Sequence, residues 1–194
     1  MIRISFHTKM FGAIFILFEL LLCVTNGGIW YNLLKDRIKE GEECMMRIVI
    51  DGDGCPVKEE AMSLADNFDL PILIVTSVAH YTTKEYPSYV QFVYVDKGAQ
   101  QADYAIMNQL KTDDILITHD YGLASMAMNK CLAVFHHSGN QYLPETIDFL
   151  LEQRYFSEKM RKARLKTKGP KTFTQSGRAF FKVNLRNFLL SVIN

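Results

Sequence analysis

Five short, mostly apolar runs, all but the second followed by a segment with helical spacing, constrain the fold of this chain most strongly. Strands that are apolar throughout are typical of a parallel sheet covered on both faces. Strands that alternate with helices along the chain indicate an α/β fold with a parallel sheet flanked by helices. The expected strands are residues 47–50, 72–75, 90–95, 115–118 and 132–135. The expected helices are residues 56–68, 99–111, 120–129, 144 to about 154 and about 174–193.

Charge is divided unevenly along the chain. The 194 residues are enough for one good core, and their net charge is only +1. Residues 45–153, however, contain 15 acidic and 6 basic side chains, whereas residues 154–194 contain 11 basic side chains and one acid, Glu158. A basic tail on an acidic body favours a polyanionic partner, although a solvated helical face would give the same composition.

Residues 1–44 differ in character from the rest. An apolar run, residues 10–24, follows Arg3 and Lys9 and is short for a membrane span. Three interpretations stay open: a translation start assigned too far upstream, an export signal or membrane anchor, and a folded extension. We therefore divide the chain into an N-terminal extension, 1–44, and a domain, 45–194, whose basic tail begins at about residue 154. A wrongly assigned start predicts a cytoplasmic protein, and four scattered cysteines without zinc-ligand spacing agree with a reducing compartment.

Several acids follow the expected strands. Asp51 and Asp53 come directly after the first strand, Asp120 follows the fourth in Thr118-His-Asp120, and Asp103 lies one turn into a helix. The carboxyl ends of parallel strands meet at one edge of the sheet, where ligands bind in open α/β folds. Clustered carboxylates repel each other unless a cation neutralises them, and hard oxygen ligands suit Mg²⁺ or Mn²⁺. The matching chemistry is metal-assisted phosphodiester hydrolysis.

Other interpretations of these residues stay open. Asp120 can be only a helix N-cap, and Asp103 only a first-turn acid favoured by the helix dipole. Asp-x-Asp after a first strand is also found in haloacid dehalogenase-type phosphatases, but Cys55 stands where they have Thr or Val. We interpret Cys55 as a small residue packed in the turn, and the pair His136-His137 as part of a loop.

Four ordered motifs carry a family resemblance. The stretch Asp51-Gly-Asp-Gly-Cys-Pro-Val-Lys58 resembles the opening Asp-Ala-Asp-Ala-Cys-Pro-Val of the bacterial YaiI/YqxD family, and residues 102–103, 114–124 and 168–174 are similar to its later motifs. The resemblance covers residues 46–190. It implies a PIN-like domain, a fold of metal-dependent nucleases that act mainly on RNA, in a family regarded as functionally uncharacterised. This chain departs from the pattern at Gly52 and Gly54, which replace alanines and should loosen the turn, and at Gly177, which replaces an acid.

The resemblance and the acids together predict a Mg²⁺- or Mn²⁺-dependent ribonuclease or other phosphodiesterase. Asp51, Asp103 and Asp120 correspond to the metal-binding acids of PIN domains, with Asp53 assisting and Thr118 orienting the cluster. Basic side chains of the tail are expected to hold the phosphates of RNA, and they are Lys159, Arg161, Lys162, Arg164, Lys166, Lys168, Lys171 and Arg178. The alternative is a nucleic-acid-binding or regulatory module that binds RNA without cutting it.

Overall fold

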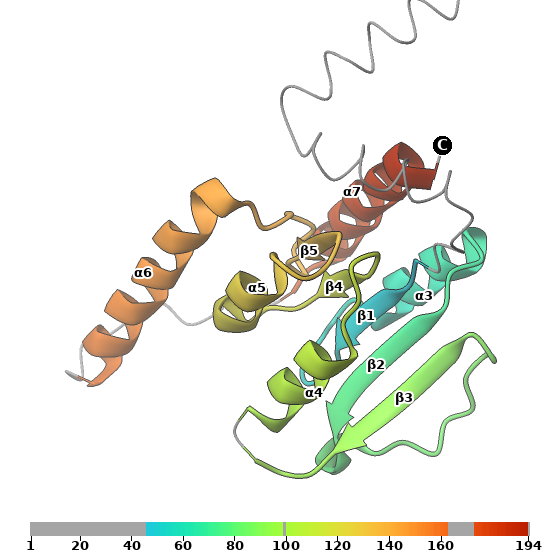
Figure 1. Ribbon diagram of the computed structural model, residues 1–194, viewed down its shortest axis with the longest axis horizontal. Helices are drawn as coiled ribbons and strands as arrows, with labels where there is room; N and C mark the ends of the chain where they lie inside the picture. Colours follow the sequence, from blue (N-terminus) through green and yellow to red (C-terminus); the bar gives the residue numbers. More distant parts are fainter. Residues whose placement is uncertain (1–45, 99, 163–172, 194) are drawn as a thin grey trace, which may run out of the picture. The chain divides into compact units, whose positions relative to one another are not determined.

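A computed structural model describes residues 46–98, 100–162 and 173–193. Five parallel strands form one sheet in the order β3-β2-β1-β4-β5. The strands are β1 (Ile48–Asp51), β2 (Ile72–Ser77), β3 (Val90–Val95), β4 (Ile115–Ile117) and β5 (Ala133–Phe135). The helices are α3 (Lys58–Asn67), η1 (Val78–His80), α4 (Gln101–Gln109), α5 (Tyr121–Ala127), α6 (Pro144–Lys162) and α7 (Gln175–Ile193). The α/β class and its parallel sheet are therefore confirmed, and Figure 1 shows the arrangement.

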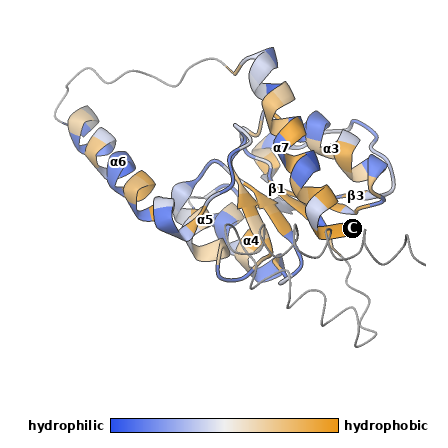
Figure 2. Cartoon of the chain, turned by 90° about the horizontal axis from the view of Figure 1, so that it is seen from above, coloured by the Kyte–Doolittle hydropathy of each residue, from blue (hydrophilic) through white to orange (hydrophobic). Residues whose placement is uncertain are grey.

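Helices cover both faces of the sheet, as the apolar strands predict. Alternate residues of each strand point to opposite faces. On one face Val49, Leu73 and Leu116 pack with buried residues of α4 and α5. On the other face lie α3 and α7, which contact each other, and Figure 2 shows the apolar strands between these two helical layers. Phe181 and Leu185 of α7 are fully buried, so the predicted docking of the last helix on the sheet domain is confirmed.

The order of the strands fixes where a site can form. The chain builds outward from β1 through β2 to β3, then crosses back to β4 on the other side of β1 and continues to β5. The crevice at the carboxyl ends of the strands opens at such a reversal, which here lies between β1 and β4. Asp51 is the last residue of β1, and Thr118 directly follows β4. The topology therefore brings two of the predicted site residues to the switch point.

The turn after β1 is tight. Gly52 donates its N–H to the carbonyl of Val75 at 2.7 Å, and a Cβ on Gly52 would come within 2.8 Å of the Thr76 Cβ. Gly54 has a φ of +76°, which favours glycine. Gly52 therefore allows the chain to pass close to β2, whereas Gly54, around which a Cβ would meet no atom within 4 Å, supplies the left-handed conformation of the turn. That these glycines loosen the turn stays a prediction.

The helix boundaries differ from expectation by no more than two residues, except at the end of α6. The helix expected from Pro56 begins at Lys58, and Pro56 lies in the preceding turn. Helix α6 continues to Lys162 instead of ending at about Arg154, because residues 155–162 contain no glycine or proline that would stop it. Among the described residues, no helix is long and apolar enough to cross a membrane.

Candidate functional site

Asp51 is the buried centre of the acidic cluster. Its side chain is only 6% exposed, and its Oδ2 accepts a hydrogen bond from the Thr118 hydroxyl at 2.8 Å. Burial raises the pKa of Asp51, and the negative charges of Asp103 and Asp53 raise it further, while Thr118 and His119 act in the opposite direction. Asp51 therefore lies close enough to two other acids to feel their charges.

Asp120 is held by the start of helix α5. Its Oδ1 accepts from the N–H of Gly122 at 2.7 Å and from that of Leu123 at 3.2 Å, which confirms Asp120 as the N-cap. The backbone N–H of Asp120 donates to the Thr118 hydroxyl oxygen at 3.0 Å. Thr118 thus contacts both Asp51 and Asp120, as its predicted orienting role requires.

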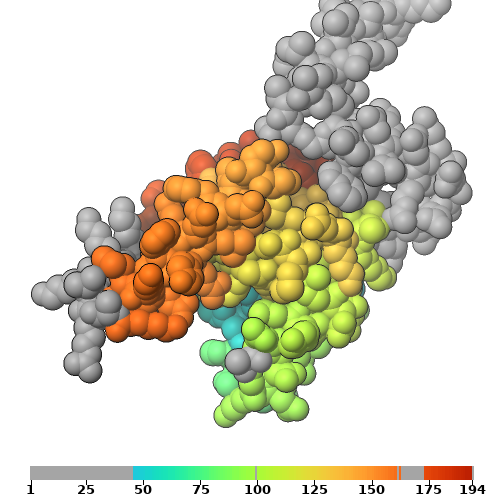
Figure 3. Space-filling model, turned by 60° about the vertical axis from the view of Figure 1, so that its left-hand side comes forward, coloured from blue at the N-terminus to red at the C-terminus, as the bar shows by residue number. Residues whose placement is uncertain are grey.

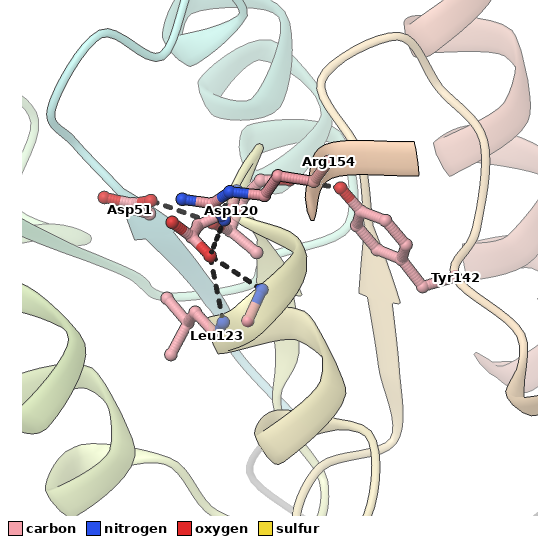
Figure 4. A network of polar contacts seen from close by, with 7 residues as sticks. Asp51, Asp120, Leu123, Tyr142 and Arg154 are labelled. Atoms are coloured by element: carbon pink, nitrogen blue, oxygen red, sulfur yellow. Dashed lines mark hydrogen bonds and ion pairs between the residues drawn. The ribbon is translucent and has the colours of Figure 1, made fainter. Parts of the chain in front are cut away.

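Arg154 reaches the same carboxylate from helix α6. Its Nη1 lies 2.8 Å from Asp120 Oδ1, and Figure 4 shows the side chain extending from α6 to Asp120. Burial alone raises the pKa of Asp120, but the hydrogen bonds from Arg154, Leu123 and Gly122 outweigh burial and lower it. A guanidinium already balances one charge of the acidic cluster.

Asp103 and Asp53 flank this pair. Burial raises the pKa of Asp103 and so does Asp120, whereas Arg154 lowers it. Asp53 is tied to β2, because its Oδ1 accepts from the Thr76 hydroxyl at 2.6 Å and from the Ser77 N–H at 3.0 Å.

The fold thus brings four predicted acids to one edge of the sheet. Residues of the β1–α3 region reach the surface there between α6 and α4, seen in cyan in Figure 3.

The acids offer only oxygen ligands, which suit Mg²⁺ or Mn²⁺. As they stand, however, no three His, Cys, Asp or Glu side chains of the described residues are arranged to hold a metal ion. Asp120 Oδ1 already accepts from three donors, one of them charged. A cation shared by Asp51, Asp103 and Asp120 therefore requires rearranged side chains, including movement of Arg154.

Three histidines lie beside the cluster. The rings of His136 and His137 are 4.1 Å apart, and those of His119 and His137 are 5.9 Å apart. Burial lowers the pKa of His136 to about 4, with smaller contributions from His137 and His119, so His136 is neutral at pH 7. The Nδ1 of His136 accepts from the N–H of Ser138 at 3.1 Å, within the loop expected from the sequence.

Burial also raises the pKa of Cys55 to about 11, which agrees with a packed, unreactive thiol.

The predicted phosphate-binding side chains fall into three groups. Lys159 and Lys162 are exposed on α6, and Lys162 pairs with Glu158 at 2.8 Å. Arg178 on α7 is already engaged, because its Nη1 donates to Glu60 at 3.1 Å and to the carbonyl of Pro56. The Arg161 side chain and residues 164, 166, 168 and 171 lie outside the described part. Phosphate binding by this set stays a prediction.

Sequence reasoning missed Arg154 and His119 as members of the site. Arg154 is 34 residues from Asp120 along the chain, and only the docking of α6 on α5 brings them together. The uneven charge of the chain shows that basic residues gather after Gln153, but it does not indicate which of them reaches the acids.

We predict opposite stability changes for two single substitutions in protein treated with a chelator. Asp51→Asn should raise the free energy of unfolding at pH 7, because the folded state disfavours ionised Asp51. The folded pKa of Asp51 is raised above its unfolded value of 3.8, so this gain should be absent below pH 3.8, grow as pH rises from there towards the folded pKa, and be complete above the folded pKa. Asp120→Ala should lower the free energy of unfolding by about 1 kcal/mol, since it removes the N-cap.

Urea unfolding between pH 3 and pH 8 measures both changes. The pKa of Asp120 is lowered, so the ionic part of its contribution is present above 3.8 and should be lost as pH falls through the folded pKa. Destabilisation by Asp51→Asn at pH 7 would contradict the electrostatic description of the cluster.

Comparison with known proteins shows which family the chain belongs to. The family model described as "Uncharacterized BCR, YaiI/YqxD family" matches residues 49–191. A UPF0178 protein of Enterococcus faecalis is 53% identical over 137 residues, which cover 71% of this chain and 93% of the relative. A UPF0178 protein of Bacillus mycoides is 43% identical over 144 residues, which cover 74% of this chain and 99% of the relative. No solved structure matches the chain. The match to the family model over most of residues 46–194, together with these identities, shows that the chain belongs to the YaiI/YqxD family.

Proposed function

We propose that this protein is a Mg²⁺- or Mn²⁺-dependent phosphodiesterase that acts on RNA at the carboxyl ends of β1 and β4. The observation that carries the proposal is the convergence of Asp51, Asp53, Asp103 and Asp120 at the switch point of the sheet, where the pKa of Asp51 is raised by burial and by two of its acidic neighbours. A carboxylate buried among like charges lowers the stability of the folded protein unless a cation neutralises it or it binds a proton. Such carboxylates are therefore common at functional sites.

Three of the acids would bind the ion, and the fourth would add negative charge beside it. Asp51 and Asp103 would supply ligands with Asp120, while Asp53, fixed to Thr76 and Ser77, would add negative charge from the side of β2. A bound Mg²⁺ or Mn²⁺ would lower the pKa of a water molecule and stabilise charge on the phosphate. Thr118 would keep Asp51 oriented through its 2.8 Å hydrogen bond, and helix α5 would keep Asp120 in place.

Arg154 would bind a phosphate of the RNA. Its guanidinium pairs with Asp120, and its side chain is 47% exposed, so the solvent side offers it space to turn away from Asp120. A guanidinium can bind two phosphate oxygens at once, which a lysine cannot do with the same geometry. Arg154 released from Asp120 would therefore gain a phosphate of RNA as its new partner.

The alternative is a module that binds RNA without cutting it. It is favoured by the ion pair between Arg154 and Asp120, which neutralises Asp120 without any metal. The phosphatase alternative still rests on the Asp51-x-Asp53 spacing alone, because the two hydrogen bonds from β2 hold Asp53 Oδ1 in place without assigning the carboxylate a role.

We predict that Asp51→Asn abolishes metal-dependent cleavage of RNA while leaving RNA binding intact or tighter, because the substitution removes one negative charge from the site. Cleavage of a labelled RNA with Mn²⁺ and with EDTA measures the first effect, and fluorescence anisotropy in EDTA measures the second. Asp148→Asn is the matched control, since Asp148 is exposed on α6. Wild-type protein that binds RNA but shows no cleavage with Mn²⁺ or Mg²⁺ would favour the alternative.

The basic tail provides a separate prediction about binding. Neutralising Arg161, Lys162, Arg164, Lys166 and Lys168 together should weaken binding to RNA of every sequence, because the contacts expected of them are with phosphates, which carry no sequence information. It should also reduce the dependence of log K on log salt concentration by about one unit for each phosphate that the tail no longer binds. An unchanged affinity and an unchanged salt dependence would show that the tail is a solvated face.

A further inference from the structure

Four aromatic rings lie in contact along the edge strand β3 and the loop before it. We call Tyr81, Tyr86, Phe92 and Tyr94 the aromatic row. Ring centres are 5.1 Å apart between Tyr81 and Tyr94, 5.7 Å between Tyr94 and Phe92, and 4.8 Å between Phe92 and Tyr86. Figure 1 shows the loop between η1 and β3 running back beside β3 at the edge of the sheet.

Alternation along β3 explains how the row forms. Phe92 and Tyr94 are two residues apart and therefore point to the same face of the sheet. Their neighbours Val93 and Val95 point to the opposite face and pack against the core. Because β3 is an edge strand, the loop before it can place Tyr81 and Tyr86 against the two β3 rings.

Packing at the edge of the sheet explains the partial burial of three rings of the aromatic row but not the exposure of the fourth. Phe92, Tyr94 and Tyr86 are half-buried, as expected for rings that close the edge of a sheet. Tyr81 is 66% exposed, so most of its ring is accessible to a ligand. An exposed ring supported from one side by a second ring is a firm planar surface.

The row begins where the acidic cluster ends. His80 precedes Tyr81, and its Nε2 lies 4.0 Å from Asp53 Oδ1. Asp53 is two residues from Asp51, whose pKa its charge raises. At the other end of the row, Lys84 Nζ lies 5.4 Å from the centre of the Tyr86 ring. Cationic or ionisable groups thus stand at both ends of the aromatic row.

We propose that the aromatic row is a stacking surface for bases of a single-stranded nucleic acid whose backbone passes over the acidic cluster. This inference rests on the proposed function and specifies its substrate as a strand with unpaired bases. Every base has a flat π face, so a tyrosine ring binds bases with little regard to sequence. In a duplex the bases are already stacked on each other and cannot reach Tyr81. The row therefore selects single strands.

Substitution of Tyr81 tests the inference in the full-length protein. Anisotropy in EDTA, with a fluorescein-labelled 12-nucleotide RNA as a single strand and as a duplex, reports binding without cleavage. Tyr81→Ala should weaken single-strand binding by about 5- to 150-fold, the range expected when one base no longer stacks on a ring, and should leave duplex binding unchanged. Tyr81→Phe keeps the ring and should bind as wild type. Phe149→Ala removes a ring that is 61% exposed on α6 and should have no effect.

Four outcomes overturn the inference. The first is wild-type protein that binds no single strand, and the second is Tyr81→Ala protein, with an unchanged melting temperature, that binds single strands as wild type does. Equal weakening by Tyr81→Phe and Tyr81→Ala would indicate a hydroxyl contact instead of stacking. Dissociation of a wild-type dimer by Tyr81→Ala, measured by sedimentation, would show that the edge of β3 pairs with a second copy.

Cleavage separates this inference from the proposed function. Single-strand binding that depends on the Tyr81 ring, without cleavage by wild-type protein in Mn²⁺ or Mg²⁺, would support the stacking surface and refute the nuclease. Metal-dependent cleavage by wild-type protein, together with single-strand binding that Tyr81→Ala does not change, would support the nuclease and refute the stacking surface.

Discussion

The hydrogen bond from Thr118 to Asp51 joins the two strands between which the order of the sheet reverses. It fixes a carboxylate that is 6% exposed at the end of the central strand β1. The same hydroxyl accepts from the N–H of Asp120, so β1, β4 and the start of α5 meet at one oxygen atom. A buried charge in this position needs such partners, because burial alone strongly disfavours its ionised form.

The cluster around this bond is balanced in part by groups from outside the sheet. Arg154 of α6 neutralises Asp120, while His119 lowers the pKa of both Asp51 and Asp103. On the other side of the domain Arg178 of α7 pairs with Glu60 and packs over the Phe173 ring. The two basic side chains thus differ in role: one lies on the candidate site, and the other fastens α7 to α3.

The sequence predicted the strands and the acids better than it predicted the basic residues. Apolar runs locate strands because burial on both faces leaves no place for polar residues, and the carboxyl ends of parallel strands are geometrically fixed. Asp51, Asp103 and Asp120 could therefore be assigned to one edge without a structure. The partners of Arg154 and Arg178 are 34 and 118 residues away, and nothing local in the sequence selects them. The aromatic row was missed for the same reason, since Tyr81 and Tyr94 meet only after the loop folds back along β3.

The acids at β1 and β4 are proposed to hold a divalent cation, and the position of Mn²⁺ in a crystal is the measurement that decides whether they do. Mn²⁺ scatters anomalously, so a soaked crystal of the protein reveals the ion without assumptions about activity. We expect an anomalous peak at about 2.0–2.6 Å from carboxylate oxygens of Asp51, Asp103 and Asp120. We also expect Arg154 to have moved away from Asp120. An empty cluster at millimolar Mn²⁺, with the ion pair between Arg154 and Asp120 intact, would contradict the claim.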